Sequence, residues 1–568
     1  MDNAQTHPET PSQSESLSQR ETPSPHESPS RLAVNVYLLL GLLTLVWSSY
    51  AFQDSSAQYV IGIVIEMALA VGALIFMRLE KRTVPWRSIG GILRWRWPGW
   101  RLVGLSGALA LGLWMIGVIL NLITTVILGY TAPMPPSTFP RTIPEAFLLL
   151  VATVIAAPLC EELMFRGYVQ RAYERRSPWT GIVVSGVIFT LYHLRFQGAM
   201  ALAPVAFALG FVAWRSNSLF PGMLLHAAYN SIASAVLIAS SFFSMPVVSG
   251  LVLSLACLSF FMVPVTAILL WFIWRWSTPP AKLALPRLTG WRAWAWIVPL
   301  VVMGNIYGIS AYGEVLVGRF PEMLAVEKLA LQPPSAWNAP AQWHYVIQTG
   351  LNETVGEANC DLAPQTNSVT LTCQVQQNAF EADLPINLPK NFEGISLPEY
   401  SATGAAFESA EHITWAKTDL SVQSMESRRE SETAQLTLTQ TTTDDGATLR
   451  VEGNGEIQTT MLPSGAFLDS DWPWRLSALP FDLAYGSTQP LVLVDRQGYV
   501  NIVDAFIVVA SSEPAWTPAG NFVTWRVTVT YTLDGKEKTL SAWYDVDAPH
   551  TLVRYDNGEV SLLLDKVE

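Results

Sequence analysis

The chain changes character near residue 313, because long apolar runs precede that point and alternating apolar and polar residues follow it. A helix needs about 20 apolar residues to span a bilayer. We predict nine spanning helices, at residues 32–51, 59–77, 102–128, 143–165, 179–194, 198–214, 219–240, 247–274 and 294–312. The predicted fold class is therefore a multi-pass α-helical membrane protein with a C-terminal antiparallel β domain.

The composition divides the chain into three parts. Of the 568 residues, 50% are hydrophobic and only 14% are charged, whereas about 25% are charged in a typical soluble domain. Residues 1–30 are rich in Ser, Pro, Thr, Glu and Gln, which predicts a disordered tail. We do not predict a signal peptide, because the first apolar run lacks a small-residue cleavage site. We predict a transmembrane helical domain at 31–313 and a soluble β-rich domain at 314–568.

Basic residues collect in three loops, which sets the expected orientation in the membrane. They follow the second, fourth and eighth predicted spans: Arg78, Lys81, Arg82, Arg87, Arg94, Arg96 and Arg101; Arg171, Arg175 and Arg176; Arg275, Lys282, Arg287 and Arg292. Since Lys and Arg are enriched in cytoplasmic loops, we predict a cytoplasmic N-terminus and an extracytoplasmic C-terminal domain. The expected location is the plasma membrane of a prokaryote. A net charge of -12 without an evident basic face argues against nucleic acid as a partner.

The C-terminal part has the pattern of antiparallel strands. Residues 522–533 alternate apolar and polar side chains, Asp534-Gly535 is a two-residue hairpin signal, and residues 539–545 supply the returning strand. We expect a sandwich or a curved sheet. Cys360 and Cys373 can form a disulfide in an oxidising compartment, although two free thiols stay an alternative. No catalytic constellation is evident in this part, which favours a binding or structural module.

Three polar clusters interrupt the apolar runs between residues 157 and 230. They are Glu161 and Glu162 with Arg166, Phe189 with His193, and His226 with Asn230. Burying a charged or hydrogen-bonding group in hydrocarbon is costly, so such residues mark functional sites. Each cluster also has a structural interpretation: a span end whose charges reach water, a hydrogen-bonded histidine, or hydrogen bonds between helices.

The same clusters match a known kind of chemistry when they are taken as one site. A carboxylate can act as a general base, and imidazoles can polarise a carbonyl or bind metal. Glu162 and Arg166 are four residues apart and can form an ion pair on one helix face, whereas Glu161 points elsewhere. Glu161, His193 and His226 are also a sensible ligand set for a divalent metal such as zinc.

Together, these clusters resemble the CAAX-protease and bacteriocin-processing family of intramembrane endopeptidases, also called the Abi, Rce-type or CPBP family. The family is marked by Glu-Glu-x-x-x-Arg, Phe-x-x-x-His and His-x-x-x-Asn motifs on successive membrane helices, and the resemblance covers about residues 100–240. It implies that Glu161 is the general base, that His193 orients the water or a metal holding it, and that His226 and Asn230 stabilise an oxyanion. It also implies that Glu162 and Arg166 form a buried pair. A metal-free glutamate mechanism and a metal-assisted one both stay open.

These residues and the β domain suggest three hypotheses for the function. The leading hypothesis is an endopeptidase that cleaves a membrane-associated protein or peptide, for which a prenylated substrate is not assumed. The second is a non-catalytic scaffold or bacteriocin-immunity protein that binds a partner through its β domain. A transporter is third, because no internal repeat is evident. In the predicted topology His193 lies late in a span running outward, whereas Glu161 and His226 lie nearer the cytoplasm.

Overall fold

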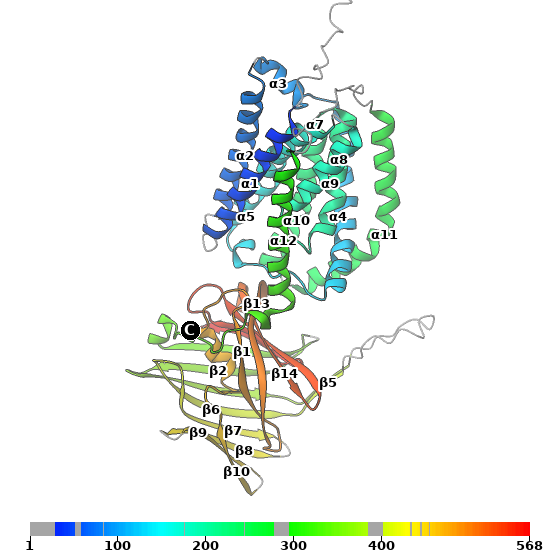
Figure 1. The fold of residues 1–568 in the computed structure, drawn as a ribbon. Coiled ribbons are helices and arrows are strands. Elements are labelled where there is room, and N and C mark those ends of the chain that lie inside the picture. Colours follow the sequence, from blue (N-terminus) through cyan, green and yellow to red (C-terminus); the bar gives the residue numbers. More distant parts are fainter. Residues whose placement is uncertain are drawn as a thin grey trace, which may run out of the picture.

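The computed structural model describes residues 29–51, 58–82, 84–174, 177–243, 245–277, 295–350, 352–383, 401–431, 434–443, 446–453 and 455–567. Figure 1 shows a helical bundle followed by a large β-sheet domain at one end of the bundle. The predicted disordered tail falls almost wholly outside the described residues. Arg175, Arg176 and most of the loop that follows the eighth predicted span also lie outside the described residues.

The bundle is built from apolar helices that run mostly along one axis (Figure 1). Their bounds are α1 Arg31–Ala51, α2 Gln58–Glu80, α3 Trp86–Ile92, α4 Trp100–Leu128, α8 Pro178–Tyr192, α9 Ala199–Ser216, α10 Phe220–Phe242, α11 Met245–Trp276 and α12 Ile297–Arg319. Between α4 and α8 lie α5 Ile143–Leu150, η3 Val151–Ala156, α6 Ala157–Glu161, η4 Glu162–Val169 and α7 Gln170–Tyr173, with the short 3-10 turn η2 Pro136–Thr138 before them.

Six helices in the described residues are long and apolar enough to cross a membrane. They are Tyr59–Glu80, Trp100–Leu128, Ile143–Tyr173, Ala199–Ser216, Phe220–Phe242 and Ile297–Arg319. The other three predicted spans coincide with shorter apolar helices, at Arg31–Val46, Pro178–Tyr192 and Phe261–Trp276. Six of the nine predicted spans are therefore supported by length and composition, and the count of nine stays a prediction.

The segment from Ile143 to Tyr173 is one long helix with two π-helical stretches, η3 and η4. A π-turn shifts the backbone hydrogen bonds by one residue, and such turns are frequent at functional sites. Thr142 caps the start, where its side chain accepts a hydrogen bond from the Glu145 amide. The two π stretches flank Glu161, so its neighbourhood is the least regular part of the helix.

The helices α8 and α9 form a hairpin that ends inside the bundle. Because α8 has only 15 residues, it is about 22 Å long at the α-helical rise. Glu161 lies about 18 Å before the end of its helix at Tyr173, which is the end nearest the start of α8. His193, which follows α8, therefore lies at nearly the depth of Glu161. Because α8 is short, the expected difference in depth between His193 and Glu161 is nearly absent.

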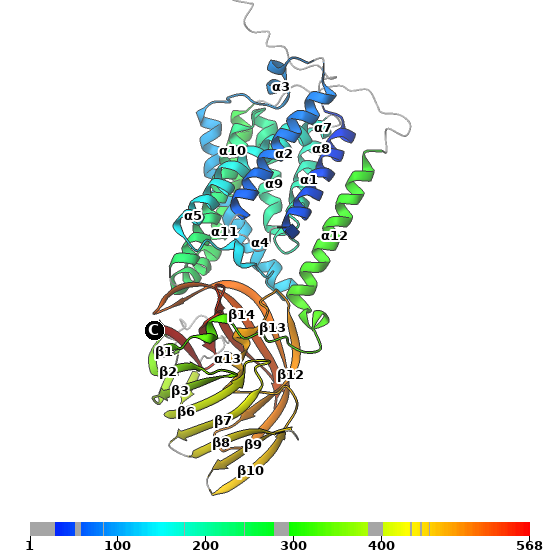
Figure 2. The same ribbon diagram turned by 90° about the vertical axis from the view of Figure 1, so that its left-hand side faces the viewer.

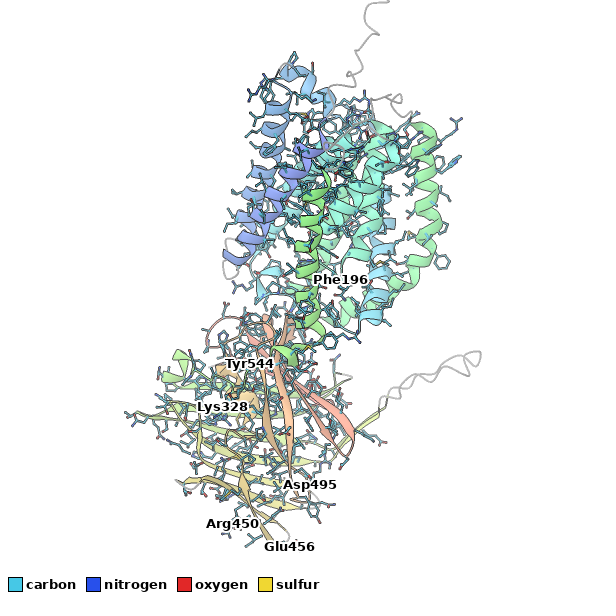
Figure 3. The ribbon with its side chains drawn as sticks, viewed as in Figure 1. Phe196, Lys328, Arg450, Glu456, Asp495 and Tyr544 are labelled. Atoms are coloured by element: carbon cyan, nitrogen blue, oxygen red, sulfur yellow. A yellow bond between two sulfur atoms is a disulfide. The ribbon has the colours of Figure 1, made fainter. Side chains whose placement is uncertain are left out.

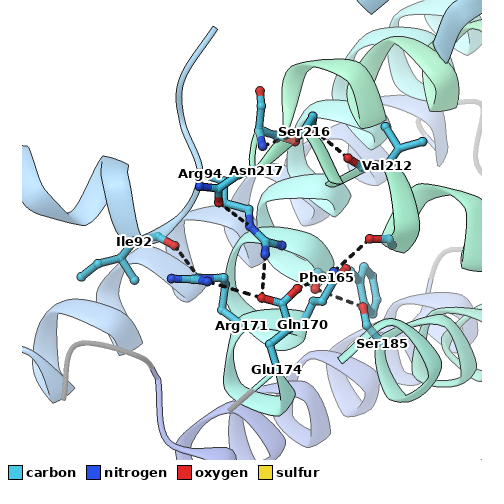
Figure 4. A network of polar contacts seen from close by, with 12 residues as sticks. Ile92, Arg94, Phe165, Gln170, Arg171, Glu174, Ser185, Val212, Ser216 and Asn217 are labelled. Atoms are coloured by element: carbon cyan, nitrogen blue, oxygen red, sulfur yellow. Dashed lines mark hydrogen bonds and ion pairs between the residues drawn. The ribbon is translucent and has the colours of Figure 1, made fainter. Parts of the chain in front are cut away.

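The end of the bundle that lies away from the sheet, where Figure 1 shows α3 and α7, contains a network of basic residues whose contacts are drawn in Figure 4. The Glu174 carboxylate accepts hydrogen bonds from Arg94 Nη2 at 2.6 Å, from Gln170 Nε2 at 2.8 Å and from Arg171 Nη1 at 3.4 Å. Arg94 also donates to the Asn217 side chain at 3.1 Å. These contacts join the turn after α3 to α7 and to the end of α9. Two of the predicted loop cations thus have a structural role as well as a topological one.

A mostly antiparallel sheet of 15 strands makes up the C-terminal domain, as predicted in type. Its order is β10-β9-β8-β7-β6-β3-β2-β1-β17-β16-β15-β14-β13-β12-β11, and β4 and β5 form a separate pair. The strands are β1 Ala341–Thr349, β2 Thr354–Pro364, β3 Ser368–Gln377, β4 Phe380–Asp383, β5 Ser401–Gly404, β6 Phe407–Ala416, β7 Val422–Ser431, β8 Gln435–Thr443, β9 Gly446–Gly453, β10 Glu456–Leu462, β11 Phe467–Leu468, β12 Gly486–Val494, β13 Val500–Thr517, β14 Gly520–Leu533, β15 Lys536–Asp545, β16 Leu552–Asp556 and β17 Val560–Val567. Only β11 and β12 pair in parallel.

The sheet curls so that its two ends approach each other (Figure 2). One core cluster contains Leu449 of β9 and Val492 of β12, which stand near opposite ends of the strand order. The short helix α13 Trp472–Arg475 lies between them in sequence, and Trp472 is fully buried. Of the two shapes expected, the curved sheet is the one observed. Because the apolar residues of both ends share one core, the open sheet buries its inner face.

Two local predictions in this domain are resolved. Leu533 pairs with Lys536 across the Asp534-Gly535 turn, in which both residues have positive φ, as a type I′ hairpin requires. Cys360 and Cys373 stand opposite each other on β2 and β3 and form a disulfide. The alternative of two free thiols is therefore not what the structure shows.

The β domain contacts the bundle at the loop that leads into the Glu161 helix. The Met134 carbonyl accepts a hydrogen bond from the Ser512 amide at 3.0 Å. Arg141 forms an exposed ion pair with Asp547 at 2.6 Å. At the end of α10, the Phe242 carbonyl accepts from the Asn521 side chain. The two domains therefore meet beside elements that carry predicted site residues.

Candidate active site

The centre of the candidate site is a fully buried ion pair. Arg166 Nη1 lies 2.9 Å from Glu162 Oε1, and neither side chain is exposed. His226 of α10 places Nδ1 3.1 Å from the same oxygen. Four-residue spacing on a helix brings Glu162 and Arg166 to one face, as the sequence predicted. A buried charge needs such a partner because leaving it alone costs several kcal/mol, roughly 3–5.

Arg166 also connects two further helices. Its Nη2 donates to the Ala206 carbonyl of α9 at 3.0 Å. The guanidinium lies over the Phe189 ring of α8, 4.3 Å from the centroid, which is a cation–π geometry. Phe189 in turn contacts the His226 ring edge-on, with centroids 5.8 Å apart. The phenylalanine of the second motif is thus a packing partner for both charged motifs.

The contacts of Glu162 determine which nitrogen of His226 carries a proton. A carboxylate in an ion pair only accepts hydrogen bonds, so His226 Nδ1 donates to it. His226 Nε2 then points toward Glu161, whose Oε2 is 3.8 Å away. Fixing one ring nitrogen in this way sets the tautomer and the orientation of the imidazole. Glu162 therefore holds His226 while leaving its other nitrogen facing Glu161.

Glu161 is placed differently from its neighbour. Its side chain is 12% exposed, and Oε2 is a buried oxygen that accepts no hydrogen bond within the described part of the chain. Glu66 of α2 also lies near Glu161. An unsatisfied buried carboxylate is rare in folded proteins. Its free oxygen is what a general base requires to bind water.

His193 stands at the end of α8, one residue beyond the helix. Its Nδ1 lies 2.8 Å from the Phe189 carbonyl, and its ring contacts the Phe189 ring at 4.7 Å between centroids. The other ring nitrogen is not used in this contact. His193 and His226 therefore flank the same phenylalanine, although the described contacts do not join either of them to the other directly.

Asn230 ties α10 to the π stretch before Glu161. Its Nδ2 donates to the Thr153 carbonyl at 2.7 Å. In a π-turn this carbonyl would accept from the amide five residues later, which is Pro158, and proline has no N–H. The Thr153 hydroxyl also bonds with Ser234 at 2.8 Å. Asn230 thus replaces a missing backbone donor, and its second amide hydrogen stays available.

Close packing of α10 against Glu162 depends on a glycine. A Cβ atom at Gly222 would lie 2.9 Å from Glu162 Oε2, closer than side chains normally approach. The small residue therefore allows the helix that carries His226 to reach the ion pair. This residue and Thr153 were missed as site residues. Pro158 could have indicated the free carbonyl, since it removes the donor that carbonyl would use.

The three predicted metal ligands do not converge in this geometry. Among the residues that the structure describes, no three His, Cys, Asp or Glu side chains form a group that could hold a metal ion. Glu161 and His226 are neighbours, but His226 Nδ1 is engaged by Glu162, and the described contacts of His193 are with Phe189. We therefore derive the chemistry below from the protein's own side chains.

The fold and the cluster define a membrane protein with a buried glutamate–histidine site. Residues 143–232 match the family described as Type II CAAX prenyl endopeptidase Rce1-like. The chain therefore carries a domain of this CPBP family in those residues, as its motifs predicted.

Parts of the chain are also similar to a bacterial protein and to a solved structure. An uncharacterized 24.3 kDa protein of Escherichia coli is 29% identical over 127 residues, which are 20% of this chain and 58% of that protein. The chain thus spans somewhat over half the length of this relative. A crystal structure of an exported-protein candidate with a YmcC-like fold from Bacteroides fragilis aligns with 42% of this chain and 100% of its own, at 9% identity. Its TM-score of 0.15 is too low to support any argument about the β domain.

Proposed function

We propose that this protein is an intramembrane endopeptidase that hydrolyses a peptide bond in a membrane-associated protein or peptide. The observation that carries the proposal is the buried Glu161, Glu162 and His226 cluster within the segment that matches the Rce1-like family. One carboxylate of this cluster is paired with a cation, and the other has a free oxygen. Two adjacent carboxylates in different environments are suited to different roles.

The reaction we propose begins with water bound at Glu161. The carboxylate accepts a proton as the water oxygen attacks the peptide carbonyl carbon, and His193 orients the water through the ring nitrogen that does not face Phe189. The carbon–nitrogen bond then breaks, and the proton passes from Glu161 to the leaving amine nitrogen. The products are a carboxylic acid and a free amine, and Glu161 returns to its carboxylate form.

His226 and Asn230 are the proposed donors to the oxyanion. Asn230 keeps one amide hydrogen after its bond to Thr153, and a positioned donor of this kind contributes about 3–4 kcal/mol in other hydrolases. His226 presents Nε2 for this role, while its Nδ1 is bound by Glu162. The Glu162–Arg166 pair touches no reacting atom in this scheme, and it fixes the position of His226.

The orientation in the membrane is part of the proposal. The residues of the two described basic regions lie at the end of the bundle away from the sheet, which favours that end as cytoplasmic (Figure 1). The disulfide in the β domain favours an oxidising compartment for the opposite end. The N-terminus would be cytoplasmic, and the β domain would lie outside. Reporter fusions after Arg319 and before α1 would test this orientation.

The decisive experiment compares new protein N-termini in membranes that contain the wild type or Glu161→Gln. Hydrolysis creates a free amine at each cleavage site, which can be labelled and sequenced by mass spectrometry. We expect termini that depend on Glu161 and His193 but survive in Glu145→Gln, a half-buried acidic residue in the first turn of the same helix. Identical termini in all variants would exclude the protease and favour the non-catalytic scaffold.

A further inference from the structure

The turn that carries His193 contains a residue with an unfavourable backbone conformation. It covers residues 193–198 between α8 and α9, and Leu194 has a φ of 54°, a conformation that side-chain-bearing residues rarely adopt. Such a conformation persists only where neighbouring structure holds it. The contacts that fix this turn therefore also set the position of the His193 ring.

The helix α12 makes these supporting contacts. The Glu314 carboxylate accepts hydrogen bonds from the Phe196 amide at 2.7 Å and from the Gln197 amide at 2.8 Å, one on each oxygen. One turn earlier in α12, the Ser310 hydroxyl donates to the Leu194 carbonyl at 3.0 Å. Three backbone groups of the turn are thus bound by two side chains of one helix. Figure 3 places Phe196 beside the part of α12 that approaches the sheet.

The same contacts continue toward the β domain. Glu314 Oε1 also accepts from the Tyr130 hydroxyl at 3.2 Å. The buried Gln197 side chain bonds to the Tyr130 carbonyl at 3.2 Å and accepts from the Ala132 amide at 2.6 Å. This is the loop whose Met134 pairs with β13 through Ser512. Two of the connections between bundle and sheet, α12 and this loop, therefore meet at the His193 turn.

We propose that Glu314 is a positioning residue, through which the helix leading into the β domain holds His193 in the geometry that hydrolysis needs. This inference rests on the proposed function, and it assigns a role to a residue outside the family-matched segment. A carboxylate that accepts two backbone amides fixes both donors in one plane, and charge-assisted bonds of this type are short and strong. A displacement of about 1 Å at a catalytic group can lower the rate about 100-fold.

The test compares four purified full-length variants with the wild type and with Glu161→Gln in lipid nanodiscs. Glu314→Ala removes both acceptors, Glu314→Gln keeps one, and Ser310→Ala removes the third contact. Asn305→Ala is the matched control, because this polar residue on α12 bonds only to the Val301 carbonyl of its own helix. Cleavage of a substrate identified by the N-terminus experiment is measured together with hydrogen exchange of the Phe196 and Gln197 amides.

We expect Glu314→Ala to lower kcat by about 10- to 100-fold with an unchanged KM, while both amides exchange faster. Glu314→Gln should recover part of the loss, and Asn305→Ala should match the wild type. Faster exchange with an unchanged kcat would overturn the inference, as would unchanged exchange. If Glu314→Ala does not fold, an unaffected kcat in Ser310→Ala overturns it instead. Normal cleavage by Glu161→Gln would refute the proposed function itself, and the inference with it.

Discussion

Both domains bury charged groups, but they satisfy them differently. In the β domain Asp471 accepts from Arg475 at 3.1 Å and from the Leu468 amide at 2.7 Å, so each of its oxygens has a donor. In the bundle, Glu161 and Glu162 each retain an Oε2 without a donor. Among the described residues, the buried carboxylate oxygens that lack a partner all belong to the bundle. The bundle therefore has carboxylate oxygens free for a further donor, such as water at Glu161, whereas both oxygens of Asp471 are already bound.

The largest effect that would test this difference is expected from Arg166→Leu. Removing the guanidinium leaves Glu162 buried without its counter-charge, which should destabilise the bundle by roughly 3–5 kcal/mol and abolish cleavage. The double variant Glu162→Leu with Arg166→Leu should recover most of the stability but none of the activity, because His226 loses its acceptor. Thermal unfolding in detergent measures the first quantity. A double variant that cleaves normally would contradict the positioning role of the pair.

A second effect should be confined to the β domain. Replacing Cys360 and Cys373 with alanine removes a disulfide that closes a short loop, and we expect a loss of about 3 kcal/mol in the stability of that domain. Cleavage should be retained at temperatures where the domain stays folded. Cys160→Ala, which changes the buried free thiol of α6, is the control and should leave the unfolding of the sheet unchanged.

A third test uses pH, through a carboxyl group in the β domain. Burial raises the pKa of Glu411 to about 7, against the opposing effect of Arg429 nearby. The folded domain then binds a proton that the unfolded chain releases above pH 4.5, so stability falls as pH rises from about 4.5 to 7. The total is roughly 3 kcal/mol. Glu411→Gln should flatten the pH dependence of the unfolding midpoint, whereas the exposed Glu426→Gln should not.

The smallest effect concerns the approach of α10 to the ion pair. Gly222→Ala places a methyl group 2.9 Å from Glu162 Oε2, which we expect to cost about 1–2 kcal/mol and to lower kcat. Gly104→Ala on α4 meets no atom within 4 Å, and it should be neutral or stabilise the helix by up to about 1 kcal/mol. Equal behaviour of the two variants would show that the close approach at Gly222 has no role.

Much of the candidate site could be predicted because its motifs are local. The spacing of Glu162 and Arg166 on one helix face, and the placement of His226 on a later helix, follow from helical periodicity and apolar run length. The fifth predicted span, residues 179–194, agrees with α8 within two residues, but the sequence did not place His193 and Glu161 at a similar depth, because that depends on how two separate helices pack. A hydrogen bond between helices was one of the predicted roles of Asn230, but the sequence could not identify its acceptor, because the Thr153 carbonyl is a backbone group of another helix.

The sequence by itself determined that this chain is a membrane bundle joined to a β domain, and which side chains could do chemistry there. Apolar periodicity, hairpin signals and motif spacing are all properties of short segments, so they can be read along the chain. Only the tertiary structure decided which nitrogen of His226 faces Glu161, how Thr153 finds a donor, and that Glu314 binds the His193 turn. Those contacts join residues from 64 to 118 positions apart, and no local pattern specifies a pairing at that range.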